Sequence, residues 1–180
     1  MIFHFLSCNP KYQEKLRKEL NDHNIQFDFS YNQILNLEYL DAFLKECLRL
    51  FPVVTRCSRI ASEEIPVSAS YVIPKGSYTH INISNVHKNK DFWGEDAEKF
   101  KPERFMDGRE IHPFAWIPFF AGGRNCIGQR LAIMELKTCL VKLILKFDFS
   151  IQDPKPLEFK SSITREVINA PKLLINDIRK

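Results

Sequence analysis

The sequence predicts a mainly α-helical fold with small β-sheets, and three stretches support this prediction. Residues 37–51 carry apolar side chains at helical spacing, and residues 129–147 form a second long stretch of the same kind. Residues 78–83 instead show the two-residue alternation of a strand. With 180 residues, 44% of them hydrophobic and 27% charged, the chain can bury a core and has the size of one domain or of a large piece of a bigger one.

The front of the chain predicts two helices separated by a polar linker. Residues 1–6 are mostly apolar, but they are too few and lack the basic flank of a signal peptide or membrane span. Asn9 can cap a helix whose first position is Pro10. After a polar linker at 21–33, the helix with the clearest apolar stripe follows and stops at Pro52.

The rest of the chain alternates between short strands, irregular segments and one long helix. Short strands are expected over 53–84, with a turn at 74–76, where the sequence is PKG. Residues 85–118 are rich in proline and aromatic side chains and predict irregular structure. The long helix is expected over 129–147, and the prolines beyond it predict loops with one or two strands.

Charge, cysteine and histidine patterns exclude several classes of function. The net charge of +4 comes without a run of Lys or Arg, so no nucleic-acid-binding arm is predicted. Five cysteines without a CxxC spacing give no disulfide framework, and a reducing compartment fits them better. The five histidines show no HxxxH or HExxH spacing, which leaves zinc with little support.

Residues 119–128, FFAGGRNCIG, concentrate three of the six glycines around one cysteine. Cys126 lies just before the long helix, where free N–H groups and the helix dipole favour a thiolate over a thiol. Gly122 and Gly128 allow a tight backbone and keep side chains away from a flat ligand approaching the sulfur. Arg124 offers a planar cation suited to a carboxylate. The stretch therefore predicts a loop that presents one thiolate to a large ligand with carboxylates, and haem fits that description.

Other roles for Cys126 stay open at this point. A lone cysteine is more often a structural or surface thiol than a ligand. A hydrolase-type nucleophile is a weaker alternative, because the sequence places no histidine near Cys126 as a base.

The same loop resembles the haem-binding loop of the cytochrome P-450 family. That family has the pattern F-x-x-G-x-R-x-C-x-G, and five positions of this chain match it: Phe119, Gly122, Arg124, Cys126 and Gly128. The resemblance implies that Cys126 is the axial thiolate ligand of a haem iron and the sole iron ligand from this chain.

Two further motifs extend the resemblance through nearly the whole chain. "ECLR" supplies the family's E-x-x-R at Glu46 and Arg49, and "PERF" supplies its later motif at Arg104. The text is closest to microsomal eukaryotic members, above all the fatty-acid ω-hydroxylase group. The resemblance implies that residues 1–180 form the carboxy-terminal part of the cytochrome P-450 fold, from the end of the oxygen-activating helix through the haem-ligand loop to the C-terminus. No complete second domain is expected.

The resemblance also assigns roles to residues around the haem. Arg124 and Arg59 would pair with the propionates, and Phe119 would pack beside the thiolate and tune it. Glu46, Arg49 and Arg104 would form a buried ion network that holds the scaffold of the loop. The chain supplies no residue that we assign as catalytic.

Helical spacing alone gives a different expectation for Glu46 and Arg49. The pair lies opposite the apolar stripe at i, i+3, where it would ordinarily be a solvated surface pair. Further along, Cys139 is expected in the core. A set of basic residues is expected at the surface, either as ordinary charges or as part of a docking face for an acidic reductase: Arg130, Lys137 and Lys142.

The resemblance implies a parent enzyme that inserts one oxygen atom into an apolar substrate such as a fatty acid, sterol or xenobiotic. Its electrons would come from an NADPH-dependent reductase. The parent would lie on the cytosolic face of the endoplasmic reticulum membrane, held there by an amino-terminal part that has no counterpart here. The family's acid–alcohol pair for oxygen activation falls just before Met1 in this comparison, so these 180 residues alone are expected to be inactive. The alternative is a non-catalytic haem-binding or interaction remnant of a truncated gene product.

Overall fold

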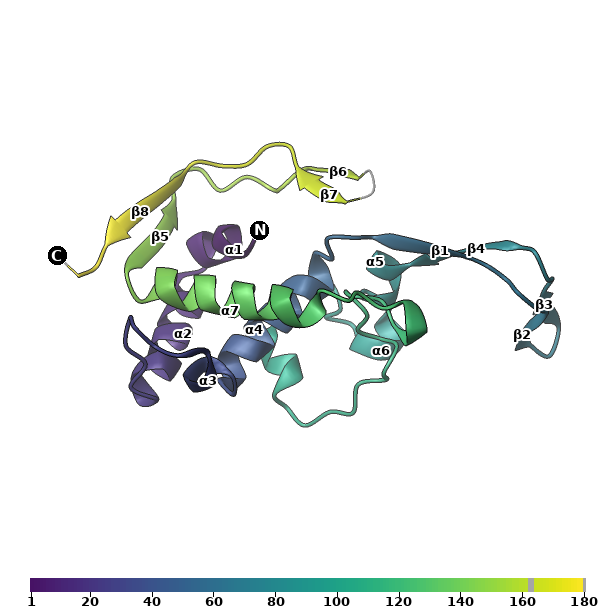
Figure 1. The fold of residues 1–180 in the computed structure, drawn as a ribbon. Helices are drawn as coiled ribbons and strands as arrows, with labels where there is room; N and C mark the ends of the chain where they lie inside the picture. The colour runs from purple at the N-terminus through teal and green to yellow at the C-terminus, as the bar shows by residue number, and fades with distance from the viewer. Residues whose placement is uncertain (162–163, 180) are drawn as a thin grey trace.

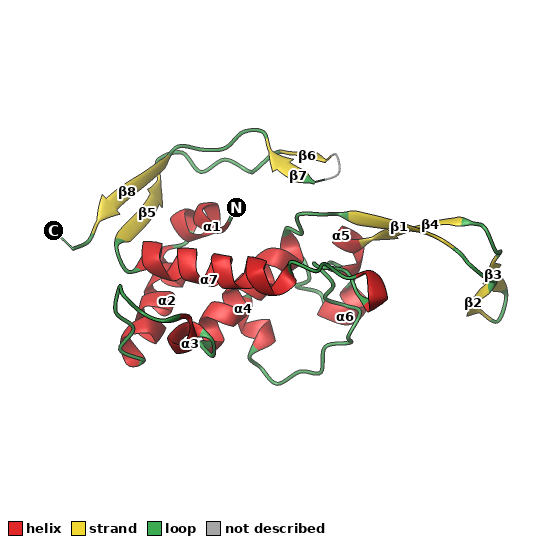
Figure 2. Ribbon diagram, in the orientation of Figure 1, coloured by secondary structure: helices red, strands yellow, loops and turns green. Residues whose placement is uncertain are grey.

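The computed structural model describes residues 1–161 and 164–179, and its fold is mainly helical with small antiparallel sheets (Figures 1 and 2). The predicted fold class is therefore confirmed. No helix of this described part is both long enough and apolar enough to cross a membrane. The helices and 3-10 turns are α1 (Ile2–Cys8), α2 (Pro10–Asp22), α3 (Tyr31–Ile34), α4 (Glu38–Leu50), α5 (Ile83–Val86), α6 (Lys90–Trp93), η1 (Pro102–Phe105), η2 (Gly122–Arg124) and α7 (Gln129–Ile144).

The strands form two-stranded antiparallel sheets. β2–β3 and β6–β7 pair strands that follow one another in the chain, whereas β1–β4 and β5–β8 each pair strands that have another pair between them. The pairs are β1 (Arg56–Ile60) with β4 (Tyr78–Asn82), β2 (Ile65–Ser68) with β3 (Tyr71–Ile73), β5 (Phe147–Ile151) with β8 (Leu173–Asp177), and β6 (Phe159–Ser161) with β7 (Arg165–Val167).

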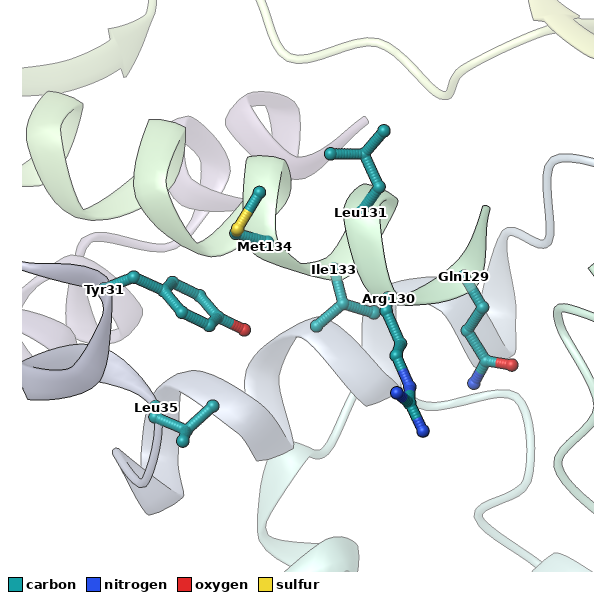
Figure 3. Close-up of a pocket in the computed structure, with 7 residues that line it drawn as sticks. All are labelled: Tyr31, Leu35, Gln129, Arg130, Leu131, Ile133 and Met134. Atoms are coloured by element: carbon teal, nitrogen blue, oxygen red, sulfur yellow. The ribbon is translucent and has the colours of Figure 1, made fainter. Parts of the chain in front are cut away.

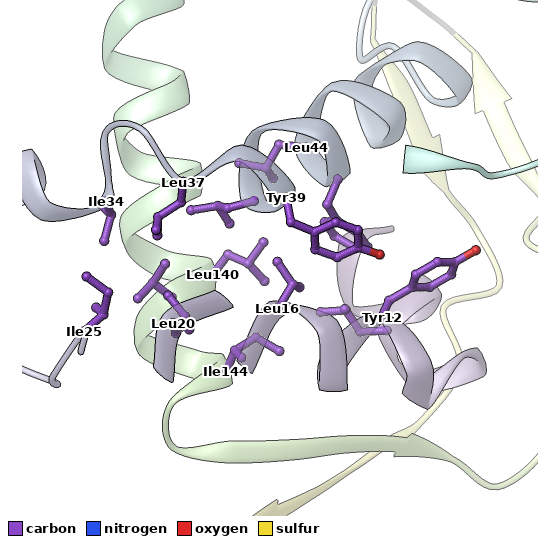
Figure 4. Packing of buried hydrophobic residues seen from close by; sticks show 14 of the residues in the cluster. Tyr12, Leu16, Leu20, Ile25, Ile34, Leu37, Tyr39, Leu44, Leu140 and Ile144 are labelled. Atoms are coloured by element: carbon purple, nitrogen blue, oxygen red, sulfur yellow. The ribbon is translucent and has the colours of Figure 1, made fainter. Parts of the chain in front are cut away.

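The main core lies where α2, α4 and α7 pack together, and α7 runs across the middle of the molecule (Figures 1 and 4). Leu16 and Leu20 of α2 meet Leu44 of α4 and Leu140 and Ile144 of α7 in one buried cluster. Each such side chain stabilises the fold by about 1.5–3 kcal/mol when it leaves water. The core therefore anchors α4 and α7, the two helices that carry or follow the predicted site residues.

The starts of these helices depend on side chains from elsewhere in the chain. α2 begins with Pro10 at its first position, as expected, but the Asn9 side chain donates to Phe5 O (3.2 Å) instead of capping α2. α4 has no cap of its own; Glu19 of α2 accepts from Tyr39 N (2.6 Å) and Leu40 N (2.9 Å) instead. A carboxylate at a helix N-terminus satisfies free N–H groups and complements the helix dipole.

The long helix ends three residues earlier than predicted. α7 stops at Ile144, and Phe147 starts β5. Arg17 of α2 takes over the free carbonyls there, with Nε donating to Ile144 O (3.1 Å) and Nη2 to Phe147 O (2.7 Å). A cation on the last carbonyls of a helix stabilises its end.

Several local predictions differ from the structure for similar reasons. Ile83 begins α5 instead of continuing the strand, because the Asn82 side chain accepts from Asn85 N and caps a helix there. The segment after α7 holds β5, β6, β7 and β8, more than the one or two strands expected. Cys139 is exposed, not in the core, and Lys137 is buried, not on the surface.

Candidate functional site

The cysteine loop is closed on itself by backbone hydrogen bonds. Cys126 N donates to Phe119 O (2.9 Å), and Asn125 N donates to Gly122 O (3.1 Å) within the turn of η2. Gln129 N then donates to Cys126 O (3.3 Å) as α7 begins, with Gly128 at its N-cap. These bonds hold the Cys126 backbone on both sides while its thiol stays exposed.

The glycines of the loop serve different purposes. Gly122 has φ +78°, a conformation that side chains disfavour, so the turn itself requires glycine. Gly128 has an ordinary φ of −84°, but a Cβ there would lie 4.0 Å from Cys126 Sγ and cover part of the sulfur. Phe120 has φ +64°, which costs a residue with a side chain about 1–3 kcal/mol. Such strain, in a loop that also carries an exposed thiol, is typical of a functional loop.

The other cysteines are less suited to bind a ligand. Cys47 is buried in the core, and burial raises the pKa of its thiol. Cys8 lies 3.7 Å from His4 Nε2, and Cys57 is half-buried in β1. Cys139 is exposed but lies in the middle of α7, without a loop around it. Cys126 is therefore the thiol that the chain presents.

The predicted propionate partners lie on separate elements. Arg124 is exposed, and within the described part of the chain its guanidinium has no hydrogen bond or ion pair. Arg59 is exposed on β1, where its Nη1 donates to Ser58 O (2.8 Å). No hydrogen bond or ion pair between described residues joins Arg59 to the cysteine loop. Both guanidinium groups keep N–H donors free for a carboxylate.

These residues fit a haem by the chemistry of their donors. A thiol is a soft ligand that suits iron, and the two arginines suit the two carboxylates of the ring. Ile127, next to the cysteine, is wholly exposed and apolar, as a flat apolar ligand would need. No cluster of three or more metal-ligating side chains occurs within the described residues.

Glu46, Arg49 and Arg104 form a cluster in which all three side chains are 0% exposed. Arg49 grips the Glu46 carboxylate with two bonds, Nε to Oε2 (2.7 Å) and Nη2 to Oε1 (2.9 Å). Arg104 Nε adds a third at 3.1 Å, and Lys101 N a fourth at 2.8 Å. The i, i+3 pair of α4 is therefore not the solvated pair that helical spacing alone suggests.

The remaining donors of the cluster are satisfied by residues on both sides of α6. Arg49 Nη1 donates to His87 O and Ala97 O, both at 2.6 Å. Arg104 pairs with Asp96 at 3.2 Å, so two carboxylates balance two guanidinium groups. Arg49 also lies over the Trp93 ring, 4.8 Å from its centroid. A buried ion cluster is tolerated when every charge is paired and hydrogen-bonded, and this one meets that condition.

The segment that leads into the cysteine loop is fixed to α4. Trp116 Nε1 donates to Lys45 O (3.1 Å), one residue before Glu46. The cluster and the loop are thus connected through the same helix. Sequence patterns gave no signal for Asp96 or Trp93, because their roles depend on long-range packing onto α4.

A groove of about 570 Å³ lies along the start of α7 (Figure 3). Tyr31 and Leu35 form one wall, and α7 residues including Leu131 and Met134 form the other. Arg130 stands at this groove with no charged partner in the described part of the chain.

The other two basic residues expected at the surface are engaged within the chain. Lys137 is paired with Asp41 (2.7 Å) and donates to Leu35 O (2.6 Å). Lys142 donates to Phe27 O (2.9 Å). Of the three, Arg130 alone has no partner among the residues that the structure describes.

The fold and the site define a class of protein in which an exposed cysteine heads a long helix and a Glu–Arg–Arg cluster lies buried. The family model of cytochrome P450 matches residues 1–175. Probable cytochrome P450 4p3 of Drosophila melanogaster is 38% identical over 165 residues, covering 90% of this chain and 31% of that protein. Cytochrome P450 4p1 of the same species is 37% identical over 165 residues, covering 88% of this chain and 32% of that protein. Cytochrome P450 3A31 of Mesocricetus auratus is 33% identical over 174 residues, covering 93% of this chain and 33% of that protein.

The chain belongs to the cytochrome P450 family. The family resemblance of the sequence motifs is confirmed, and membership implies a haem cofactor. The chain spans about a third of the length of the curated relatives it matches.

Proposed function

We propose that the chain is the haem-binding, carboxy-terminal part of a haem-thiolate monooxygenase, with Cys126 as the axial ligand of the iron. The observation that carries this proposal is the exposed Cys126 thiol on a loop closed by its own hydrogen bonds. A ligand to iron must be deprotonated and held in place, and a fixed backbone with a free sulfur provides the second of these conditions.

Each residue of the loop then has a distinct task. Arg124 and Arg59 would bind the haem propionates through their free N–H donors, and Phe119 would border the sulfur. Gly122 permits the turn, and Gly128 leaves the sulfur uncovered. When bound, a thiolate-ligated haem supplies the chemistry that activates oxygen.

The buried cluster would hold the scaffold of the loop. Glu46, Arg49 and Arg104 fix α4 to the segment before the loop, and Trp116 ties that segment to α4 at Lys45 O. A rigid support of this kind keeps a ligand loop in its productive geometry.

The whole protein would insert one atom of oxygen into an apolar substrate, such as a fatty acid, sterol or xenobiotic, with electrons from an NADPH-dependent reductase. Arg130 at the start of α7 has no charged partner among the described residues, which supports docking of an acidic reductase near the thiolate. The parent would act at the cytosolic face of the endoplasmic reticulum membrane. Substrate-dependent NADPH consumption coupled to hydroxylated product, measured on the full-length protein, tests this part.

The ligand assignment is tested by two matched alanine variants at exposed cysteines. In the haem-loaded full-length protein, Cys126→Ala should abolish the red-shifted Soret band of the reduced carbon-monoxide complex, which depends on thiolate ligation. Cys139→Ala should leave the band unchanged, because Cys139 lies in the middle of α7. A band that survives Cys126→Ala and is lost with Cys139→Ala would overturn the assignment.

A further inference from the structure

His87, at the C-terminal end of α5, is fully buried and uses both ring nitrogens. Its Nδ1 lies 3.0 Å from Arg49 O, and its Nε2 lies 2.8 Å from Ile117 N. A carbonyl only accepts and a backbone N–H only donates, so Nδ1 must carry the proton and Nε2 must be bare. The contacts therefore admit only the neutral imidazole.

These two bonds connect the buried cluster with the cysteine loop. Arg49 belongs to the cluster, and its Nη1 also donates back to His87 O (2.6 Å). Ile117 lies two residues before Phe119, whose carbonyl accepts from Cys126 N. Ile117 O itself accepts from Phe120 N (3.0 Å), the residue with the strained φ. His87 thus holds the point at which the loop begins.

We propose that His87 is a positioning residue that fixes the start of the cysteine loop against α4, and that it does so only while its ring is uncharged. This inference rests on the proposed function in so far as the loop carries the iron ligand. It goes beyond that function by giving the loop an acid-sensitive support.

Protonation would break the support for two reasons. A proton on Nε2 would point at the Ile117 N–H and replace an acceptor with a second donor. The new charge would also lie beside Arg49, in a cluster where Glu46, Arg104 and Asp96 already pair with one another. In accord with this, burial and, to a smaller extent, the Arg49 charge lower the pKa of His87 to about 4, although the hydrogen bond to the Arg49 backbone opposes the shift.

The direction of the pH effect follows from that lowered pKa. A released, solvated His87 would take up a proton near its ordinary pKa of about 6.5, whereas the docked ring does so near 4. The equilibrium constant for docking is therefore highest above about pH 6.5 and falls by up to about tenfold per pH unit as the pH falls towards 4. Below that range both states are protonated and the loss levels off.

Hydrogen exchange at the Ile117 amide, measured by NMR on the 180-residue chain and corrected for the intrinsic rate, reports this docking. The Phe149 amide, which donates to Gln13 Oε1 (2.9 Å) far from the loop in sequence, serves as the internal reference. Between pH 6.5 and 4, Ile117 protection should fall by up to about tenfold per unit relative to Phe149. A parallel fall at both amides would show general unfolding and overturn the proposal.

Two amide variants separate the two bonds of the ring. His87→Gln can place a neutral oxygen near the Nε2 position, so Ile117 should stay protected and its pH dependence should disappear. His87→Asn reaches only the Nδ1 position, so Ile117 should exchange about tenfold faster even at pH 7, as expected for one lost hydrogen bond. The exposed His112 gives the matched control, and His112→Gln should follow the wild type.

The proposal fails if His87→Gln keeps the wild-type pH profile or if His87→Asn protects Ile117 as well as the wild type. Neither readout needs haem, so Cys126→Ala should leave both unchanged. A failed thiolate assignment and a failed His87 assignment are therefore distinguishable. In the haem-loaded full-length protein, His87→Asn should lower the share of thiolate-type carbon-monoxide complex, whereas His87→Gln should preserve it.

Discussion

The buried ion cluster and the cysteine loop are built on opposite principles. In the cluster, Glu46, Arg49 and Arg104 are fully buried, and their charged groups are bound by other side chains or by backbone carbonyls. In the loop, the backbone is hydrogen-bonded, but the Cys126 thiol and the Arg124 guanidinium are exposed. Stability and the proposed ligand binding are thus assigned to different residues of one chain.

The difference implies that substitutions in the two regions should have separate effects. Removing one member of a buried ion cluster leaves a charge without its partner, which strongly destabilises a fold. Removing an exposed group that touches nothing leaves the fold intact. Urea unfolding of the 180-residue chain, followed by far-UV circular dichroism, measures the first kind of effect, and haem spectra measure the second.

The largest effect should come from Arg49→Ala, which leaves the Glu46 carboxylate buried without its main partner. We expect the free energy of unfolding to fall by about 3–5 kcal/mol. Lys45→Ala is the matched control on the same helix, because no hydrogen bond or ion pair of the described residues involves the Lys45 side chain, and it should stay within about 0.5 kcal/mol of wild type. Equal losses in both variants would refute the buried-cluster account.

A buried but uncharged group shows whether charge or burial sets the cost. The Gln13 amide donates to Leu6 O (2.8 Å) and Phe149 O (2.7 Å) and accepts from Phe149 N (2.9 Å). Gln13→Ala leaves these backbone groups without their hydrogen-bond partner, so the free energy of unfolding should fall by about 1–3 kcal/mol. The exposed Gln26→Ala should cost much less. A loss for Gln13→Ala as large as that for Arg49→Ala would mean that burial, not charge, dominates.

Removing a charged but half-buried group should lower the free energy of unfolding by less than either of these changes. Glu19 caps α4 from α2, and Glu19→Ala should cost about 0.5–2 kcal/mol, the usual range for a lost helix cap. Glu19→Gln keeps one acceptor oxygen and should lose less. Glu14 is exposed on the same helix, so Glu14→Ala should leave the free energy of unfolding almost unchanged in the same experiment.

The smallest effect on stability should come from the residue with the largest effect on haem binding. Cys126→Ala should change the free energy of unfolding by less than about 0.5 kcal/mol, because the thiol is exposed. Unfolding of the chain without haem checks this value. A loss comparable to that of Gln13→Ala would show that the loop contributes to the fold and would remove the contrast between the two regions.

The sequence predicted best what neighbouring residues decide together. The helices α2, α4 and α7 follow from apolar spacing, and the cysteine loop follows from ten consecutive residues. Helical spacing shows which residues share a face, but it does not show what covers that face. Glu46 and Arg49 looked solvated for this reason, because the segment around Trp93 and Asp96 that buries them lies far along the chain.

The errors on α7 have the same origin. Lys137 looked like a surface charge, but the free carbonyl of Leu35 in the α3 region draws its ammonium inward. Cys139 looked like a core residue, but its side of the helix is exposed. The end of α7 was also predicted at the wrong residue, because the side chain that binds its last carbonyl, Arg17, belongs to α2 and is distant in the sequence. Each case needs a contact between residues more than a hundred positions apart, or the absence of a covering element, and local patterns contain neither.

The contacts between α2 and β5 have a consequence for solubility. The N–H and C=O groups of alternate residues in an antiparallel strand point to the same edge, and on the edge away from β8 they meet α2. The Gln13 side chain hydrogen-bonds both the N–H and the C=O of Phe149, and the Arg17 side chain donates to the carbonyl of Phe147. Four residues of a helix rise about 6 Å and two residues of a strand about 6.6–6.8 Å, so the side chains of one helix turn keep step with the strand.

An open strand edge is a template on which another chain can add a strand and start aggregation. The side chains of α2 bond the backbone groups of β5 that a neighbouring strand would otherwise bond. Because α2 is a helix, it presents no open strand edge of its own. The two-stranded sheet is thereby ended on this side by a helix that cannot propagate it. Protection against strand-to-strand association between molecules is thus built into the same residues that join the first helices of the chain to its last sheet.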